Sequence, residues 1–231
     1  MKKLVIFGLG KIGEVAYRHI VRDGAYEVVA FTCDAEWMEG RSRHFGLPVH
    51  PFEEIERHVP PEAAELFVAI GYHDLNAARA AKCAAAKAKG YRLGTYVSPR
   101  SDGGPWNEVG ENCLILDGVG IQPGVRIGND VSIWNNTLLG HHSSIEDHCW
   151  IAAGATLGGS VHLGERSFVG LNATVGGEVT IGAQCFIGGG ALVLKDAAPK
   201  SVFVERATER FRLDSDAFLR LTTMPSLAVR K

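Results

Sequence analysis

The sequence lacks paired cysteines, a surplus of basic charge and any long apolar run. Its five cysteines are scattered and include no CxxC pair, so the sequence favours a protein of the reducing cytoplasm over one with a disulfide framework. A net charge of -2 leaves no basic surface of the kind that binds nucleic acid. Because no apolar stretch approaches roughly 18 residues, we expect no membrane span.

Glycine is abundant, at 28 residues, which indicates many tight turns. The first ten residues, MKKLVIFGLG, combine two lysines with a short apolar run. Gly8 and Gly10 interrupt that run and no small-residue cleavage site follows, so we expect a buried strand rather than a signal peptide.

Residues 1–98 alternate short apolar runs with helical stretches. The expected strands are Leu4–Phe7, Val28–Cys33, Leu66–Ile70 and Arg92–Val97, and the expected helices are Ile12–Arg22 and Leu75–Lys89. This alternation predicts a small parallel sheet covered on both faces, that is, an α/β domain of the Rossmann-like type.

The second half of the chain has a period of six. From residue 109 to residue 198 it can be written without a gap as VGENCL, ILDGVG, IQPGVR, IGNDVS, IWNNTL, LGHHSS, IEDHCW, IAAGAT, LGGSVH, LGERSF, VGLNAT, VGGEVT, IGAQCF, IGGGAL and VLKDAA. The first residue is always Val, Ile or Leu, and the fifth is always small or β-branched. Such hexapeptides predict a left-handed parallel β-helix, in which three repeats make one triangular coil. Residues 18 apart then stack in columns at a spacing of roughly 4.8 Å.

Three domains follow from these patterns. We expect a Rossmann-like domain over residues 1–98, a β-helix of about five coils over residues 99–198, and a tail over residues 199–231. The tail has mixed charge and a weak helical period, and we expect it to fold back on the helix or on an adjacent subunit.

Three of the cysteines occupy the fifth position of their hexapeptides. Cys113, Cys149 and Cys185 are 36 residues apart and therefore share one column at a spacing of roughly 10 Å, which is too far for a disulfide. We expect them to be packing residues.

One column of the predicted helix indicates chemistry. It contains Pro123, His141, Gly159, Gly177 and Lys195 in that order, so two coils beyond the histidine present no side chain. Glycines at tight corners are common, but a histidine at the foot of this column favours a site with exposed backbone amides. Neutral imidazole acts as a general base near neutral pH, and amide N–H groups stabilise an oxyanion. Together they indicate acyl transfer from a thioester.

A metal site is the competing use of histidines. The helix contains His141, His142, His148 and His162, and the six-residue frame scatters them over different corners and coils. Because a metal site needs about three ligands that converge on one ion, we expect no metal.

The whole chain resembles a known group of enzymes. From Lys3 to Asp196 it is similar to the sialic acid O-acetyltransferase and bacillosamine N-acetyltransferase group of bacterial sugar acetyltransferases. In the first domain the resemblance rests on IFGLGKIGEVA, FTCD and VAIGYHDLNAAR. In the helix it rests on LLGHHSSIEDHCWIAAGATLGGSVHLGERSFVGLNATVGGEVTIG and IGGGALVLKD.

The resemblance implies a homotrimer with acetyl-CoA in a groove between adjacent helices. It implies His141 as the catalytic base and the amide of Gly159 as the group that holds the thioester carbonyl. Further contacts to the coenzyme would involve Gly177, Gly189 and Lys195. The nucleotide sugar would lie against the first glycine loop, with its reactive group directed at the histidine of a neighbouring helix.

The sequence departs from the group at four positions. Relatives often have a carboxylate next to the catalytic histidine, where this chain has His142, so the group that orients the base is unassigned. Trp150 stands where some relatives have another histidine. Lys11 and Ile12 occupy the part of the glycine loop where many members have a histidine. These changes leave the acetyl donor unaffected and put the acceptor in doubt.

The glycine loop allows a second interpretation. Gly8, Gly10 and Gly13 form a GxGxxG motif after a strand, and Asp34 ends the next strand about twenty residues later. This pattern is typical of NAD binding. The domain is short, however, and no constellation for a hydride-transfer substrate precedes the helix. We therefore favour a nucleotide sugar, bound through a UDP, GDP or dTDP diphosphate.

Two further residues are predicted at the same edge of the sheet. Gly71 and Asp74 follow the third expected strand, where they could contact the nucleotide. Capping of the following helix by Asp74 or Asn76 is an equally good interpretation.

The sequence thus favours acetyl-CoA-dependent acetylation of the amino group of a nucleotide-linked 6-deoxy amino sugar. His141 accepts the amine proton, and the Gly159 amide holds the oxyanion. Three rival functions stay open: O-acetylation of a sialic acid or related sugar, a non-catalytic trimeric nucleotide-binding scaffold, and an NAD-linked enzyme.

Overall fold

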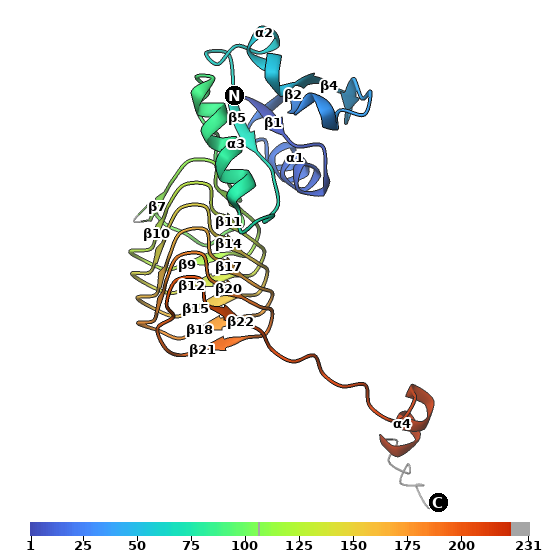
Figure 1. The fold of residues 1–231 in the computed structure, drawn as a ribbon, viewed down its shortest axis with the longest axis vertical. Coiled ribbons are helices and arrows are strands. Elements are labelled where there is room, and N and C mark those ends of the chain that lie inside the picture. Colours follow the sequence, from blue (N-terminus) through green and yellow to red (C-terminus); the bar gives the residue numbers. More distant parts are fainter. Residues whose placement is uncertain (106, 223–231) are drawn as a thin grey trace, which may run out of the picture.

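A computed structural model describes residues 1–105 and 107–222 of the chain. Figure 1 shows an α/β domain seated on one end of a triangular prism of stacked coils, with the C-terminal segment leaving from the other end. Within the described residues, no helix is long and apolar enough to cross a membrane.

The α/β domain is built on a five-stranded sheet. The sheet has the order β3-β4-β2-β1-β5, and every pair is parallel except β3 with β4. Its elements are β1 (Lys3–Phe7), α1 (Lys11–Asp23), β2 (Glu27–Cys33), η1 (Ala35–Trp37), β3 (Arg43–His44), β4 (Leu47–Pro51), η2 (Phe52–Glu54), α2 (Ile55–His58), β5 (Glu65–Val68) and α3 (Ala77–Ala88).

Alternation along β1 explains why both faces of this sheet are covered. Leu4 and Ile6 point to one face and pack with α1, whereas Val5 and Phe7 point to the other and pack beside α3. Full burial of such a side chain contributes roughly 1.5–3 kcal/mol. The central strand therefore anchors both layers.

The predicted helices and the first three predicted strands are confirmed, with small shifts of their ends. The prediction of a strand over Arg92–Val97 is wrong for its first part. Leu93 forms a single bridge to Leu66, and only β6 (Tyr96–Val97) is a strand, paired with the first coil of the prism. The predicted boundary at residue 98 thus falls after a strand that already belongs to the helix.

Sequence patterns missed the β3–β4 hairpin at the sheet edge. Its strands meet at Phe45 and Gly46, whose φ angles of 48° and 79° form a tight turn of the hairpin type. Phe-Gly is a weak signal for this turn, because Asn or Asp usually precedes the glycine. Pro48 and Pro51 also argue against a strand, although an edge position tolerates proline.

Residues 108–203 form the predicted left-handed parallel β-helix. Three parallel sheets make its faces. The first face contains β7 (Glu108–Val109), β10 (Arg126–Ile127), β13 (Ser144–Ile145), β16 (His162–Leu163) and β19 (Thr180–Ile181). The second contains β9 (Gly120–Ile121), β12 (Leu138–Leu139), β15 (Thr156–Leu157), β18 (Thr174–Val175) and β21 (Leu192–Val193). The third contains β6, β8 (Leu114–Ile115), β11 (Ser132–Ile133), β14 (Trp150–Ile151), β17 (Phe168–Val169), β20 (Phe186–Ile187) and β22 (Val202–Phe203).

The register of the coils agrees with the six-residue frame. Ile127 pairs with Ile145 and then Leu163, so residues 18 apart stack as predicted. The first and fifth residues of the repeats fill the prism, and Cys113, Cys149 and Cys185 are fully buried there. Polar fifth residues are also accommodated, since Ser143 donates a hydrogen bond from Oγ to the Gly158 carbonyl at 3.0 Å.

Each corner of the prism turns on the fourth residue of a hexapeptide. From Asn112 to Gly190 this residue always has a φ between 54° and 78°, the left-handed region that Gly and Asn adopt most easily. The third residue precedes it at the corner. We name the corners by their third residues. The His141 corner contains Pro123, His141, Gly159, Gly177 and Lys195. The Asp147 corner contains Glu111, Asn129, Asp147, Glu165 and Ala183. The Leu171 corner contains Asp117, Asn135, Ala153, Leu171 and Gly189.

A buried ion pair joins the two domains. Arg79 of α3 is almost fully buried, and its Nε donates to Asp130 Oδ1 at 2.7 Å. Asn112 Nδ2 donates to the same oxygen at 2.8 Å, and the Asn112 Oδ1 accepts from the Val68 amide of β5. The α/β domain is therefore bonded to the first coils through groups that have no access to water.

A second junction lies at the end of α1. Arg22 donates to both oxygens of Asp117, at 2.9 and 2.8 Å. Hydrogen bonds from Arg22 and Ser98 lower the pKa of Asp117 to about 2. This junction therefore stays charged at any physiological pH.

The tail does not lie against its own helix after β22. Val204 is 72% exposed, and the described chain continues as an extended segment to α4 (Ser215–Thr222), which lies away from the prism (Figure 1). Within the described tail, the residues up to Phe203 are bonded to the last coil, and the following stretch has mixed charge and few apolar groups. Residues 223–231 of the predicted tail lie outside the described residues.

Candidate active site

His141 lies at a corner of the prism, between β12 and β13, with its side chain exposed. Its imidazole covers the next glycine of the column. A Cβ on Gly159 would lie 2.6 Å from His141 Nε2 and 2.6 Å from Cε1, closer than atoms can approach. Gly159 has no left-handed φ. A side chain at position 159 would therefore displace the His141 ring from this position, whereas the turn itself does not call for glycine.

The backbone along this corner has free donors. Among the described residues, the amides of Gly159 and Gly177 donate no hydrogen bond, whereas the His141 amide donates to Gln122 Oε1 at 2.9 Å. Lys195 is exposed at the end of the same column. The structure thus brings four of the predicted residues into one column: His141, Gly159 and Gly177 with their free amides, and Lys195.

Gly189 does not belong to this column. It lies at the Leu171 corner, where the amides of Ala153, Leu171 and Gly189 also donate no hydrogen bond within the described chain. Unused donors occur at all three corners, since the amides of Asp147 and Ala183 at the Asp147 corner likewise donate no hydrogen bond within the described chain. Gly189 therefore lies at a different corner from His141.

The neighbour of His141 is a second histidine whose ring it contacts. Their Nδ1 atoms lie 3.2 Å apart, and the two rings are nearly perpendicular at 77°. His142 occupies the left-handed corner position, with a φ of 58°. The sequence placed the two residues side by side but could not show that their rings meet.

The glycine loop opens into a cleft of about 650 Å³. Gly8, Gly10 and Gly71 line it, together with Lys11 and Ile12. Gly13 serves packing instead, because a Cβ there would lie 2.1 Å from the Gly8 carbonyl oxygen. Close contact of this kind brings the N-terminus of α1 up to the end of β1.

Three residues of this cleft were not predicted from the sequence. They are Trp37, Tyr72 and His73. Trp37 is 65% exposed and Tyr72 is 51% exposed, so both aromatic rings face solvent. Exposed aromatic residues just after a strand were an available signal.

The two predicted carboxylates lie outside the lining of this cleft. Asp34 forms an ion pair with Lys82, with Nζ 2.6 Å from Oδ1. Asp74 has a left-handed φ of 49°, and α3 has no side-chain cap. Asn76 instead accepts a hydrogen bond from Arg79. Asp74 therefore forms no side-chain cap of α3 and does not line the cleft, so neither interpretation of this residue is supported.

A second cleft continues from the first. It has a volume of about 410 Å³ and shares Ile12 and Tyr72 with the glycine-loop cleft. Trp134, Trp150 and Phe168 form its wall on the helix. The wall belongs to the outer side of the third face, and the cleft extends to Leu171 and Gly189 at the Leu171 corner. We call it the aromatic cleft.

Ring contacts stabilise this wall. Tyr72 lies 5.4 Å from Trp150 and 4.6 Å from Phe168, measured between ring centroids, and Phe168 stacks on Phe186 at 4.8 Å. Such pairs contribute roughly 0.5–1.5 kcal/mol each beyond burial. Trp150, Phe168 and Phe186 are 18 residues apart in the sixth position, so the column was visible in the sequence.

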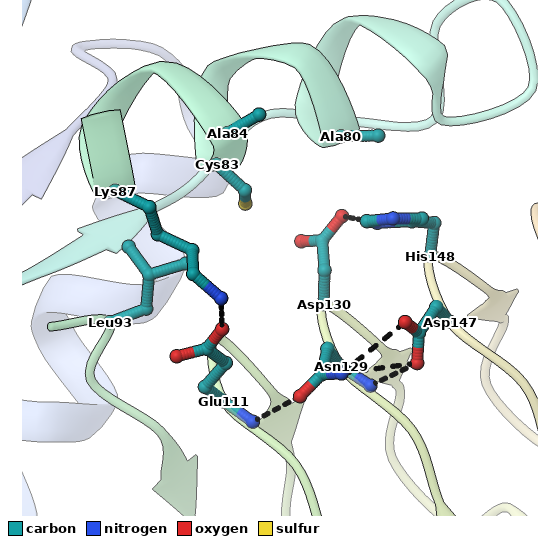
Figure 2. A pocket seen from close by; sticks show the side chains of 10 residues that line it. All are labelled: Ala80, Cys83, Ala84, Lys87, Leu93, Glu111, Asn129, Asp130, Asp147 and His148. Atoms are coloured by element: carbon teal, nitrogen blue, oxygen red, sulfur yellow. Dashed lines mark hydrogen bonds and ion pairs between the residues drawn. The ribbon is translucent and has the colours of Figure 1, made fainter.

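A third pocket lies between α3 and the Asp147 corner (Figure 2). It measures about 390 Å³, and its polar side chains bond to one another. Lys87 pairs with Glu111, Asn129 with Asp147, and His148 with Asp130 at 2.8 Å. These pairs hold α3 on the helix, and they use most of the polar side chains that line the pocket.

Thiol and metal chemistry have no support in the described residues. All five cysteines are free and buried, and burial raises the pKa of Cys113 and Cys149 to about 12. Thiols of this kind stay protonated and are poor nucleophiles. The described part of the chain contains no group of three or more His, Cys, Asp or Glu side chains that could hold a metal ion.

Family models match two parts of the helix. The bacterial transferase hexapeptide model, with six repeats, matches residues 108–141, and the hexapeptide repeat of succinyl-transferase matches residues 160–193. A search of curated protein sequences finds no significant match.

Solved structures match almost the entire chain. A mutant of perosamine N-acetyltransferase from Caulobacter crescentus, in complex with CoA and GDP-perosamine, is 27% identical with a TM-score of 0.77; the match covers 87% of this chain and 93% of that one. The acetyltransferase domain of PglB from Neisseria gonorrhoeae, in complex with acetyl coenzyme A, is 25% identical with a TM-score of 0.76, and 86% of this chain and 93% of that one are covered.

A more distant structure agrees on the fold alone. WeeI from Acinetobacter baumannii is 18% identical with a TM-score of 0.75, over 87% of this chain and 96% of that one. The resemblance indicated by the sequence is thus confirmed, as are the two-part architecture and the acyltransferase class.

Proposed function

We propose that this hexapeptide-repeat acyltransferase transfers the acetyl group of acetyl-CoA to the amino group of a nucleotide-linked 6-deoxy amino sugar. The observation that carries the proposal is the His141 corner, where an imidazole stands beside a row of unused backbone amides. The relatives bound to CoA, acetyl coenzyme A and GDP-perosamine support the choice of donor and acceptor class.

The donor lies along the His141 corner. Pantetheine accepts hydrogen bonds from the free amides of Gly159 and Gly177, and Lys195 offers a positive charge further along. This arrangement sets the thioester carbonyl beside the Gly159 amide and within reach of His141 Nε2.

The acceptor occupies the two connected clefts. Its diphosphate lies at the glycine loop, where the N-terminus of α1 and Lys11 favour an anion. Its sugar enters the aromatic cleft, whose lining contains no charged side chain. Aromatic walls suit the apolar face and the methyl group of a deoxy sugar better than a sugar with a full set of hydroxyls.

A homotrimer completes the site. The face between the Leu171 corner and the His141 corner exposes Leu138, Leu192 and Leu194, at 39%, 62% and 64%. Exposed apolar groups gathered on one face indicate a protein partner. A ring of three copies brings the His141 corner of one copy beside the Leu171 corner and aromatic cleft of the next.

The reaction then needs one base and one donor of a hydrogen bond to an oxyanion. The amine attacks the thioester carbon while Nε2 of neutral His141 accepts the amine proton. The Gly159 amide stabilises the oxyanion, a contact that contributes roughly 3–4 kcal/mol in comparable sites. The intermediate collapses with loss of the CoA thiolate, which recovers the proton from His141. The products are an N-acetyl sugar and CoA.

The test is transfer to a panel of UDP-, GDP- and dTDP-linked amino sugars, followed through the thiol of released CoA. We expect acetylation of at least one, and His141→Asn is expected to lower turnover by ~10²–10⁴ while acetyl-CoA still binds. Binding of acetyl-CoA without transfer to any amine would indicate a scaffold. Transfer to a hydroxyl of a sialic acid would indicate an O-acetyltransferase, and tight NADH binding at the glycine loop would indicate an NAD-linked enzyme.

A further inference from the structure

The rings of His141 and His142 extend in opposite directions along the helix axis and meet between the coils. His141 covers Gly159 in the following coil, whereas His142 lies against Gly124 in the preceding one, where a Cβ would be 3.0 Å from its Cδ2. Only their Nδ1 atoms face each other, at 3.2 Å.

This contact restricts where protons can be. A hydrogen bond between two Nδ1 atoms needs a proton on one and a lone pair on the other. If His142 is the donor, the Nδ1 of neutral His141 is the acceptor, and its proton then sits on Nε2, which cannot accept another. If His141 is the donor, its Nε2 carries the lone pair. Nε2 is the nitrogen beside Gly159.

We propose that His142 is a positioning residue that accepts the Nδ1–H of His141 and so keeps the lone pair of His141 on Nε2. This inference rests on the proposed role of His141 as base and assigns a function to the residue that orients it. A neutral imidazole here takes the part that a carboxylate plays in other base–orienter pairs.

The surroundings support a neutral acceptor. The preceding turn presents Gln122, Pro123 and Gly124 to the pair, and the following turn presents Gly159 and Ser160, none of which titrates. His142 is held by its left-handed backbone and by contact with Gly124. The pair therefore shares its protons with no fixed charge on these two turns.

The proton balance follows from this arrangement. When Nε2 takes the amine proton, His141 becomes a cation that still donates from Nδ1 to His142. The charge is then spread over two rings, and the proton on Nε2 leaves with the CoA thiolate. If the pair is protonated beforehand, no lone pair remains on Nε2, so one proton per pair abolishes the base.

The experiment compares His142→Gly with His142→Asp in the full-length chain. Glycine removes the ring without strain, because φ at this position is 58°, and aspartate also tolerates that conformation while supplying an acceptor. We expect His142→Gly to lower kcat by roughly 10–100-fold with an unchanged KM for acetyl-CoA. His142→Asp should restore most of kcat and move the acid limb of its pH profile up by about 1 pH unit, since an anion favours protonated His141.

A direct readout accompanies the kinetics. Imidazole ¹⁵N shifts, followed upward in pH until they no longer change, should show His141 with its proton on Nδ1 in the wild type and a mixture of tautomers in His142→Gly. His162→Asn is the matched control, because His162 bonds to Glu146 at 3.2 Å on another face and should leave kcat unchanged.

The outcomes separate the two proposals. Wild-type turnover in His141→Asn would remove the base and with it the proposed function. If His141 is essential but His142→Gly keeps both the wild-type kcat and the Nδ1–H tautomer, only the positioning role is wrong. A loss in His142→Gly that His142→Asp does not restore, with acetyl-CoA binding intact, also overturns it.

Discussion

Two corners of the same prism differ in how many of their third-position backbone amides are capped by side chains. At the Asp147 corner, side chains from adjacent coils cap third-position amides: the Glu111 amide donates to Asn129, the Asn129 amide to Asp147, and the Glu165 amide to Glu146. The amides of Asp147 and Ala183 at that corner donate no hydrogen bond within the described chain. At the His141 corner, Gln122 caps the His141 amide, and the amides of Gly159 and Gly177 have no partner in the described chain. The comparison teaches that the repeat supplies donors at every corner, and that an acceptor side chain at the second or third position of an adjacent coil decides whether a donor is used internally.

The largest expected effect concerns α3, which packs on the Asp147 corner. Arg79→Leu leaves the Asp130 carboxylate buried without its charge partner, and we expect a loss of roughly 3–5 kcal/mol in the free energy of unfolding. Urea denaturation measures it. Arg57→Leu is the control: its ion pair with Glu54 is exposed, so the change should stay within about 0.5 kcal/mol. Equal effects of the two variants would show that α3 is not held by the buried pair.

The next largest effect is expected from a substitution at the His141 corner. Gly159→Ala places a Cβ where the His141 ring lies, so we expect kcat to fall roughly 100-fold with the fold intact. Glu165→Ala is a matched control in the adjoining hexapeptide, at the same third position but at the Asp147 corner, and its kcat should not change. Steady-state kinetics and circular dichroism distinguish the two. A fully active Gly159→Ala enzyme would contradict this position of the ring.

The smallest effect tests whether capping stabilises its corner. Asn129→Ala removes the acceptor of the Glu111 amide and the bonds to Asp147, and should lower the free energy of unfolding by about 1 kcal/mol. Activity should be unaffected, because this corner lies outside the proposed site. Thermal denaturation followed by an activity assay checks both. Unchanged stability would mean that the side-chain caps at the Asp147 corner contribute nothing to the free energy of unfolding.

The helix was predictable because its signal is strictly periodic. An apolar first residue and a small fifth residue, repeated from Val109 onward, fix the strands and the register and align His141 with Gly159. Strand β4 was harder to predict from the sequence, because it contains two prolines and follows a Phe-Gly turn, which is a weak hairpin signal. Local propensity decides little at a sheet edge, where pairing with β2 determines the structure.

The site divides in the same way. The 18-residue spacing of the coils predicted that His141, Gly159 and Gly177 share one corner. The contact between the Nδ1 atoms of His141 and His142 depends on side-chain rotamers, which the spacing of residues does not determine. Gly189 was assigned with Gly159 from the family resemblance, although the frame already puts it at another corner. Tyr72 and Trp37 were missed because neither lies in a long periodic element; Tyr72 lines both clefts, and Trp37 in the three-residue η1 lines the glycine-loop cleft.

The Arg79–Asp130 pair has a consequence for how ligands enter. Since α3, β5 and the first coils are bonded through groups without access to water, the two halves of the chain cannot swing apart at low cost. A hinge motion between the α/β domain and the β-helix is therefore costly, and changes in the aromatic cleft between them fall to individual side chains. Tyr72 lines both clefts and is half exposed, so rotation of its phenol ring would change the connection between the glycine-loop cleft and the aromatic cleft.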